Sequence, residues 1–163
     1  MAAINSYVMV LLEDGRIYCR GTNNGGVFGA RQNDLIMSDQ VLSKFAKTHD
    51  AHYKDERIVD FEVASNALIF RTESDRVFFN GMFYAWNPRP FPIDVQPKRI
   101  FATEDCVGVV AEDGKIYFVN EKLIDDSELI SQKDRLYVSE DSTLEREVLG
   151  LGGKHGLIYA LLK

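Results

Sequence analysis

Two histidines with nearby carboxylates are the residues best suited by type to bind a metal ion. His49 and His52 stand beside Asp50 and Asp55, and imidazole and carboxylate groups are common zinc ligands. Helical ligand pairs are usually four residues apart, however, and the spacing fixes no third ligand. A solvated polar loop is therefore the favoured interpretation, and we predict no metal site.

The usual sequence patterns of nucleophilic catalysis and phosphate binding are absent from the chain. The segment GTNNGGVFGAR is rich in glycine, but it lacks both the GK[ST] ending of a P-loop and the spacing of a dinucleotide-binding loop. There is no G-x-S-x-G elbow, and neither Cys19 nor Cys106 has a histidine close in sequence. We expect a protein that is not an enzyme and that binds no cofactor.

One aromatic segment has the composition of a protein contact surface. It runs from Gly81 to Pro92, GMFYAWNPRPFP, and its prolines favour an extended backbone. Aromatic and arginine side chains dominate the energetics of protein interfaces. The predicted partner-binding residues are Met82, Phe83, Tyr84, Trp86, Arg89 and Phe91. The alternative is that these rings pack inside the core.

A repeated hairpin pattern indicates which elements carry these residues. It occurs as VMVLLEDGRIYC, LIFRTESDRVFF and VGVVAEDGKIYF, and GGKHGLIYALLK at the end of the chain is a partial fourth copy. Each full copy joins two apolar runs through an acidic turn whose third position is Gly15, Asp75 or Gly114. Asp-Gly between apolar runs predicts a two-residue type I′ turn with positive φ, and irregular repeats of this kind predict a repeat protein.

The apolar runs predict strands that are buried on both sides. In the first copy Val8, Val10 and Leu12 alternate with Met9 and Leu11, which is typical of strands packed between two layers. Two insertions interrupt the pattern. SDQVLSKFAKTH, within residues 33–56, predicts one short helix with Ser38 as its N-cap, and residues 121–134 predict a charged loop.

These motifs resemble the repeats of the regulator-of-chromosome-condensation family. In LLEDGRIYCRGTNNGGVFG the positions typical of the family are Gly15, Gly21, Asn23, Gly26 and Gly29, whereas Arg20 replaces the customary tryptophan. LGLGGKHGLIYAL resembles the family's second signature, with Gly152 and His155 in register, and Gly81 and Gly114 match Gly21 and Gly15. The resemblance implies that His155 is a buried core residue.

The resemblance implies an all-β fold, a partial β-propeller of about three blades in a single domain. We expect repeats at about 4–60, 61–100 and 101–150, with 151–163 as a partial strand that completes a blade. Propellers close with 4 to 8 blades, so an open arc of three leaves its terminal faces apolar. We expect either a homodimer that completes a six-bladed ring or a subunit of a larger assembly. A fragment of a longer propeller is the alternative.

Composition narrows the classes of function. A net charge of −6 and a pI of about 5.1 disfavour nucleic-acid binding. We expect neither a membrane span nor a secretory signal, and reduced cysteines in a cytoplasmic protein, with nuclear and cytoskeletal locations as alternatives. The expected function is a non-enzymatic protein-binding or structural module. The alternatives are a guanine-nucleotide exchange or regulatory factor for a small GTPase, which the resemblance allows, and a chromatin-associated protein.

Overall fold

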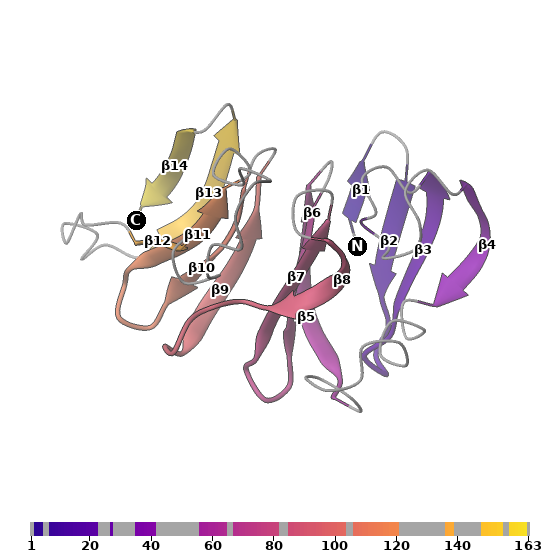
Figure 1. The fold of residues 1–163 in the computed structure, drawn as a ribbon, viewed down its shortest axis with the longest axis horizontal. Coiled ribbons are helices and arrows are strands. Elements are labelled where there is room, and N and C mark those ends of the chain that lie inside the picture. The colour runs from indigo at the N-terminus through magenta and orange to yellow at the C-terminus, as the bar shows by residue number, and fades with distance from the viewer. Residues whose placement is uncertain are drawn as a thin grey trace.

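The fold consists of short antiparallel strands arranged as successive sheets (Figure 1). The computed structural model describes residues 2–4, 7–22, 27, 35–41, 56–64, 67–81, 85–103, 106–120, 136–138, 148–154 and 157–162. The strands are β1 (Ala2–Ile4), β2 (Tyr7–Leu11), β3 (Ile17–Thr22), β4 (Leu35–Val41), β5 (Ile58–Ala64), β6 (Ala67–Thr72), β7 (Val77–Gly81), β8 (Ala85–Pro90), β9 (Pro97–Ala102), β10 (Cys106–Ala111), β11 (Ile116–Asn120), β12 (Leu136–Val138), β13 (Val148–Lys154) and β14 (Leu157–Leu162).

Three of the sheets have the same four-stranded topology. Their strand orders are β1-β2-β3-β4, β5-β6-β7-β8 and β9-β10-β11-β12, so that each sheet is a simple antiparallel meander, and β13-β14 forms a two-stranded sheet. Neighbouring sheets meet through their first two strands: β2 contacts β5, β6 contacts β9 and β10, and β9 contacts β13. The sheets therefore follow one another as an arc of propeller blades (Figure 1). The predicted all-β propeller class is confirmed.

The hairpin turns between the second and third strands share one geometry, and it differs from the predicted one. In the first blade the Leu12 amide donates to the Arg16 carbonyl at 2.8 Å, and the Gly15 amide donates to the Leu12 carbonyl at 3.0 Å. The loop thus has three residues, and φ is positive only at the third, with values of 82° at Gly15, 60° at Asp75 and 82° at Gly114. A type I′ turn needs positive φ at both central residues, so the two-residue turn was the wrong prediction.

Two apolar cores lie between the three complete blades. The first joins Met9, Ile17 and Cys19 of the first blade to side chains of the second, among them Leu68, Phe70 and Phe78. The second joins Ala67, Ile69, Val77 and Phe79 of the second blade to Ile100, Val107, Val109 and Val119 of the third. Every residue of β7 and β10 is buried. β7 is apolar on both faces because the first blade packs against one face and the third blade packs against the other.

The first blade junction is also held by hydrogen bonds. The Ile58 amide donates to the Gly15 carbonyl at 3.3 Å, and the Arg57 guanidinium donates to the Glu13 carbonyl. The Tyr7 hydroxyl donates to the carbonyl of Ala64 at 2.6 Å. The first two contacts place the turn of the first blade against the start of β5, and the third joins the start of β2 to the end of β5.

Two further predictions need correction. The helix expected from Ser38 does not form at its start, because residues up to Val41 continue β4 and pair with β3; residues 42–55 lie outside the described residues. The single partial strand expected from residue 151 is a hairpin of two strands, β13 and β14. In both segments pairing with a neighbouring strand determines the local structure. The charged loop predicted at 121–134 lies outside the described residues. Among those residues no helix is long and apolar enough to cross a membrane.

Candidate functional site

The second and third blades each have a sheet face that points toward the preceding blade, and the first blade has an equivalent face. We call it the leading face and define it by two positions on the second strand and two on the third. Strand register makes these positions equivalent in the three blades. They are Val8, Val10, Tyr18 and Arg20 in the first blade, Leu68, Phe70, Phe78 and Asn80 in the second, and Val107, Val109, Tyr117 and Val119 in the third. We call the opposite face, which carries Tyr7, Met9, Ile17 and Cys19 in the first blade, the trailing face.

The leading faces of the second and third blades are covered. Leu68 is 0% exposed and Phe78 1%, and the trailing face of the first blade packs against them. Val107 and Val109 are both 0% exposed, because the trailing face of the second blade lies over them. A leading face in this fold is therefore normally a dry blade-to-blade contact.

Within the described part of the chain, neither apolar core includes the leading face of the first blade, so no blade covers it there. Val8 is 41% exposed, although its counterparts in the other blades are completely buried. Val10 and Tyr18 are half-buried and Arg20 is exposed. An aliphatic and aromatic patch with an arginine therefore faces solvent at a position that the fold elsewhere uses for packing.

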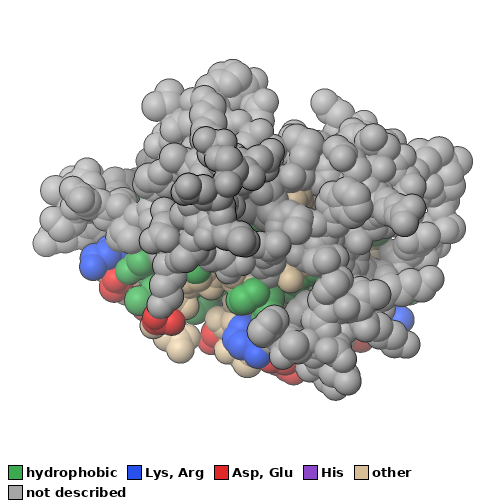
Figure 2. Space-filling model, viewed as in Figure 1, with side chains coloured by type: hydrophobic (Ala, Val, Ile, Leu, Met, Phe, Trp, Pro, Cys, Tyr) green, Lys and Arg blue, Asp and Glu red, His purple; other side chains and the backbone are tan. Residues whose placement is uncertain are grey.

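Charged side chains surround the edge of this face near the turn. The Arg16 guanidinium lies 5.8 Å from the centre of the Tyr18 ring, and its Nη2 lies 2.5 Å from a carboxylate oxygen of Asp14. The hydrogen bond from Arg16 lowers the pKa of the Asp14 carboxyl. In the second blade the Arg76 guanidinium likewise lies 5.2 Å from the centre of the Phe78 ring. Figure 2 shows charged and hydrophobic side chains side by side along the lower rim of the arc.

The aromatic segment predicted as a contact surface is only partly described. Phe91 is 5% exposed and packs edge-to-face against Phe79, with ring centroids 5.7 Å apart, which matches the alternative in which the rings pack in the core. Trp86 and Arg89 lie on β8, and the positions of their side chains are outside the described structure. Met82, Phe83 and Tyr84 are also outside the described residues, so a contact role for this segment stays a prediction.

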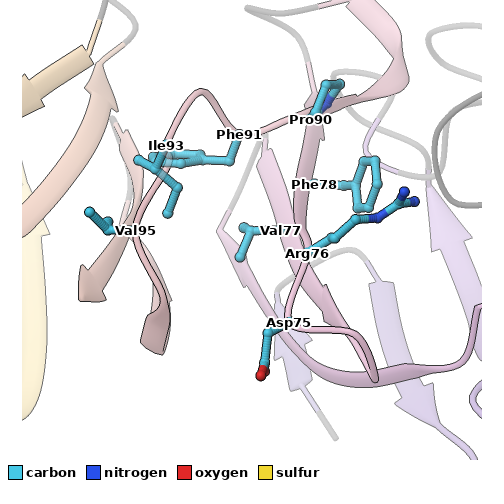
Figure 3. Close-up of a pocket in the computed structure, with 8 residues that line it drawn as sticks. All are labelled: Asp75, Arg76, Val77, Phe78, Pro90, Phe91, Ile93 and Val95. Atoms are coloured by element: carbon cyan, nitrogen blue, oxygen red, sulfur yellow. The ribbon is translucent and has the colours of Figure 1, made fainter. Parts of the chain in front are cut away.

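A small cavity borders this segment (Figure 3). Its volume is about 240 Å³, and Arg76, Phe78, Phe91 and Ile93 are among its lining residues. Phe91 and Ile93 come from the linker before β9, whereas Arg76 and Phe78 belong to the second blade. The Arg76 guanidinium is already paired with Glu56 at 3.0 Å. The cavity is smaller than typical ligand pockets, and its lining indicates no particular ligand.

The described cysteines have the environment of packing residues. Cys19 and Cys106 are both buried. Burial raises the pKa of the Cys19 thiol to about 12, and the Cys106 sulfur lies 3.0 Å from the Thr103 hydroxyl. A thiol that resists ionisation is a poor nucleophile. Among the described residues no group of three His, Cys, Asp or Glu side chains could hold a metal ion; His49 and His52 lie outside them.

The described glycines among the signature positions fall into three groups. Gly15 and Gly114 occupy the positive-φ position of the turns, and Gly21 and Gly81 have φ of 127° and 140° beside register irregularities in β3–β4 and β7–β8. Gly152 pairs with Tyr159 in the C-terminal hairpin. Asn23, Gly26, Gly29 and His155 lie outside the described residues.

Sequence reasoning anticipated apolar terminal faces in an open arc but did not identify their residues. The repeat alignment pairs Val8 and Val10 with Leu68 and Phe70, but it does not record which of these positions another blade covers. Arg20 was noted only as a departure from the family pattern, whereas the structure places it on the uncovered face.

Comparison with known proteins supports the fold and gives no relative by sequence. No protein-family model and no curated protein sequence matches the chain. Solved structures do match. Prp20p from Saccharomyces cerevisiae, described with its binding properties to Gsp1p and histones, aligns with a TM-score of 0.65 at 13% identity over 97% of the chain and 40% of that protein. Yeast RCC1 (Prp20) bound to Kap60 gives a TM-score of 0.63 at 13% identity, with coverage of 97% and 40%.

A human protein has a similar fold. WBSCR16 aligns with a TM-score of 0.54 at 12% identity, over 71% of the chain and 31% of that protein. The chain thus spans well under half the length of each of these proteins. At these identities the similarity shows a shared propeller-type fold, and fold alone does not determine function.

Proposed function

We propose that the chain is a non-enzymatic protein-binding module that associates through the leading face of its first blade. The exposure of Val8 carries this proposal: it is 41% exposed, while Leu68 and Val107 at the equivalent positions are 0% exposed. The same register position is therefore used twice for packing and once left open.

The free energy available from covering this face favours association. Complete burial of a fully exposed Val or Leu side chain contributes about 1.5–3 kcal/mol. Covering the remaining 41% of Val8 would therefore contribute about 1 kcal/mol, and Val10 and Tyr18 add further area that is only half-buried. Tyrosine and arginine are also the residue types that most often anchor protein interfaces. Val8, Tyr18 and Arg20 together form a small patch with this composition.

Guanine-nucleotide exchange on a small GTPase and chromatin association are suggested only by the similarity of fold. Prp20p is described with binding to Gsp1p and histones, but its fold similarity at 13% identity does not select a partner for this chain. The net charge of −6 disfavours direct contact with DNA. We propose neither activity.

The proposal can be tested by affinity chromatography with matched variants. Wild-type protein, Val8→Glu and Val59→Glu are immobilised and exposed to extract from the source cells. Val59 is a suitable control because it is 45% exposed and lies on β5, away from the leading face. We expect partners that are retained by wild type and Val59→Glu and lost with Val8→Glu. Equal retention by the two variants would refute the proposal.

A further inference from the structure

We propose that the leading face of the first blade binds the same face of a second copy of the chain, in a twofold-symmetric contact in which the strands of the two blades are antiparallel. This inference rests on the proposed function and names its partner. The arrangement of apolar and charged side chains on the face carries it, because this arrangement is complementary to itself when one copy is turned end to end.

The centre of the leading face is apolar. Val10 pairs with Tyr18 in the register of β2 and β3, and both residues are half-buried. Val8, two residues away on the same face of β2, is 41% exposed. Two sheets that pack face to face bury such side chains against each other, and tyrosine rings pack well in an offset stack. Val10 and Tyr18 of the two copies would therefore form the middle of the contact.

One end of the face carries an unpaired positive charge. Arg20 pairs with Val8 in the strand register, at the end of the face that lies away from the turn. Its side chain is exposed and makes no ion pair with any residue that the structure describes. A guanidinium at this position is available for a carboxylate of a partner, and such charge-assisted hydrogen bonds are stronger than neutral ones.

The opposite end of the face, at the turn, carries a carboxylate. The Arg16 guanidinium lies over the Tyr18 ring, and its Nη2 lies 2.5 Å from Oδ2 of Asp14, so Arg16 holds this carboxylate on the side of the leading face. The Asp14 side chain is still 49% exposed, and a carboxylate accepts more hydrogen bonds than Arg16 alone donates to it. With Glu13, which is also exposed, the turn has two carboxylates and one guanidinium. This end of the face is therefore negative.

The charges select one orientation of the two copies. If the strands ran parallel, Arg20 would face Arg20 and the acidic turn would face its own copy, and both contacts would be repulsive. With antiparallel strands the twofold axis crosses them at the Val10–Tyr18 pair, and Arg20 of each copy lies over the turn of the other. Each Arg20 then meets an Asp14 carboxylate, and the contact contains two identical ion pairs. This homodimer differs from the ring expected from the sequence, because like faces meet.

The contact is small, so we expect a weak dimer. Stable interfaces bury about 800 Å² on each partner, whereas the described part of this face consists of Val8, Val10, Tyr18 and Arg20. We expect a dissociation constant of about 10–100 µM. The first measurement is sedimentation equilibrium of the purified full chain from about 5 to 500 µM, which brackets this value. The mass should rise with concentration from 18.5 kDa toward twice that value.

The apolar centre is tested by the matched valine variants. Val8→Glu should raise the dissociation constant at least about tenfold, because it places a carboxylate in the buried part of the contact. Val59→Glu should dimerise like wild type. The melting curves of both variants should match that of wild type, because Val8 and Val59 are already 41% and 45% exposed in the isolated chain.

A reciprocal exchange of charges tests the antiparallel arrangement. R20D and D14R each place like charges at both ion pairs of a homodimer, so each variant alone should dimerise at least about tenfold more weakly than wild type. In an equimolar mixture, one copy of each variant restores opposite charges at both ion pairs, and the heterodimer should be about as stable as the wild-type dimer. The control is a mixture of R20D with wild type, in which one ion pair stays repulsive. Both substitutions lie at exposed positions, and D14R loses only an exposed ion pair with Arg16, so the variants should melt like wild type.

Three results would overturn the inference. They are a wild-type chain that stays monomeric over the whole concentration range, an R20D or D14R variant that dimerises as tightly as wild type, and a mixture of the two that associates no more tightly than either alone. The proposed function fails separately. A protein from the extract that is lost with Val8→Glu and kept with Val59→Glu would leave the proposed function standing even if the chain were monomeric.

Discussion

Replacement of Gly15 by alanine tests the geometry of the first blade junction. Gly15 has φ of 82°, in the left-handed region that L-residues avoid. A Cβ atom there would also lie 2.8 Å from the Arg57 Cβ and 2.9 Å from the Arg57 Cα. The alanine therefore encounters both backbone strain and a steric overlap with the start of the next blade.

The two costs can be estimated separately. The left-handed conformation costs about 1–2 kcal/mol for a residue with a Cβ, and overpacking against atoms that cannot move freely costs about 1–3 kcal/mol. The Arg57 backbone is held by the adjacent hydrogen bond from Ile58 to the Gly15 carbonyl, so the overlap is not relieved easily. We expect Gly15→Ala to lower the free energy of unfolding by about 3 kcal/mol, or the melting temperature by about 6–12 °C in a protein of this size.

The assay is urea and thermal unfolding, with Asp75→Ala as the matched control. Asp75 holds the equivalent turn position with φ of 60° and already has a Cβ, so alanine there adds no atom. Its exposed ion pair with Arg71, at 3.1 Å, contributes little, and we expect a change within about 1 kcal/mol. Equal costs at the two positions would show that the close approach of Arg57 does not contribute, which would refute this account of the junction.

Three further changes probe the interior. Gly108→Ala would place a Cβ against the Phe101 ring and 2.5 Å from the Tyr117 carbonyl oxygen, and should lower the free energy of unfolding by about 2–3 kcal/mol in chemical denaturation. The additional change Phe101→Leu should restore only part of this loss, because the overlap with the carbonyl oxygen remains, and full restoration would contradict this. Asn80→Asp should lower the free energy of unfolding by about 3 kcal/mol or more at pH 7, because it directs a buried carboxylate at the Val27 carbonyl. The loss should be smaller in acid, and a melting temperature equal to that of wild type would contradict this prediction. Burial raises the pKa of the Cys19 thiol from 9.0 to about 12, so the unfolded thiol ionises first and the free energy of unfolding should fall as the pH rises from 9 toward 12. The fall is at most about 1.4 kcal/mol per pH unit, and Cys19→Ala should reduce this slope.

The repeat in the sequence was sufficient to predict a repeat protein of paired strands, because turn chemistry and apolar alternation agree in three copies. The propeller class followed from the resemblance of these motifs to a known family. The turn position at Gly15 recurs as Asp75 and Gly114, and all three have positive φ. The turn type was wrong because Asp-Gly is compatible with both two-residue and three-residue loops. The hydrogen bond from the Gly15 amide to the Leu12 carbonyl and the positive φ at Gly15 alone identify the three-residue loop.

Tertiary pairing explains the other errors. Ser38 has the features of an N-cap, but pairing of β4 with β3 outweighs a local helical preference in a short segment. The uncovered face was equally hard to locate, since Val8 and Leu68 look alike as sequence. Their exposed fractions of 41% and 0% depend on whether a blade precedes them in space, which no local pattern records.

The two described blade junctions also show why equivalent turn positions hold different residues. At the first junction Ile58 donates its amide to the Gly15 carbonyl, and this brings the linker close enough to exclude a Cβ. The linker residue that corresponds to Ile58 at the second junction is Pro97, which has no amide hydrogen to donate. The corresponding bond to Asp75 therefore cannot form, and a turn residue with a Cβ is tolerated. The linker residue thus distinguishes the turn of the first blade, where a Cβ is excluded, from the turn of the second blade, which holds Asp75.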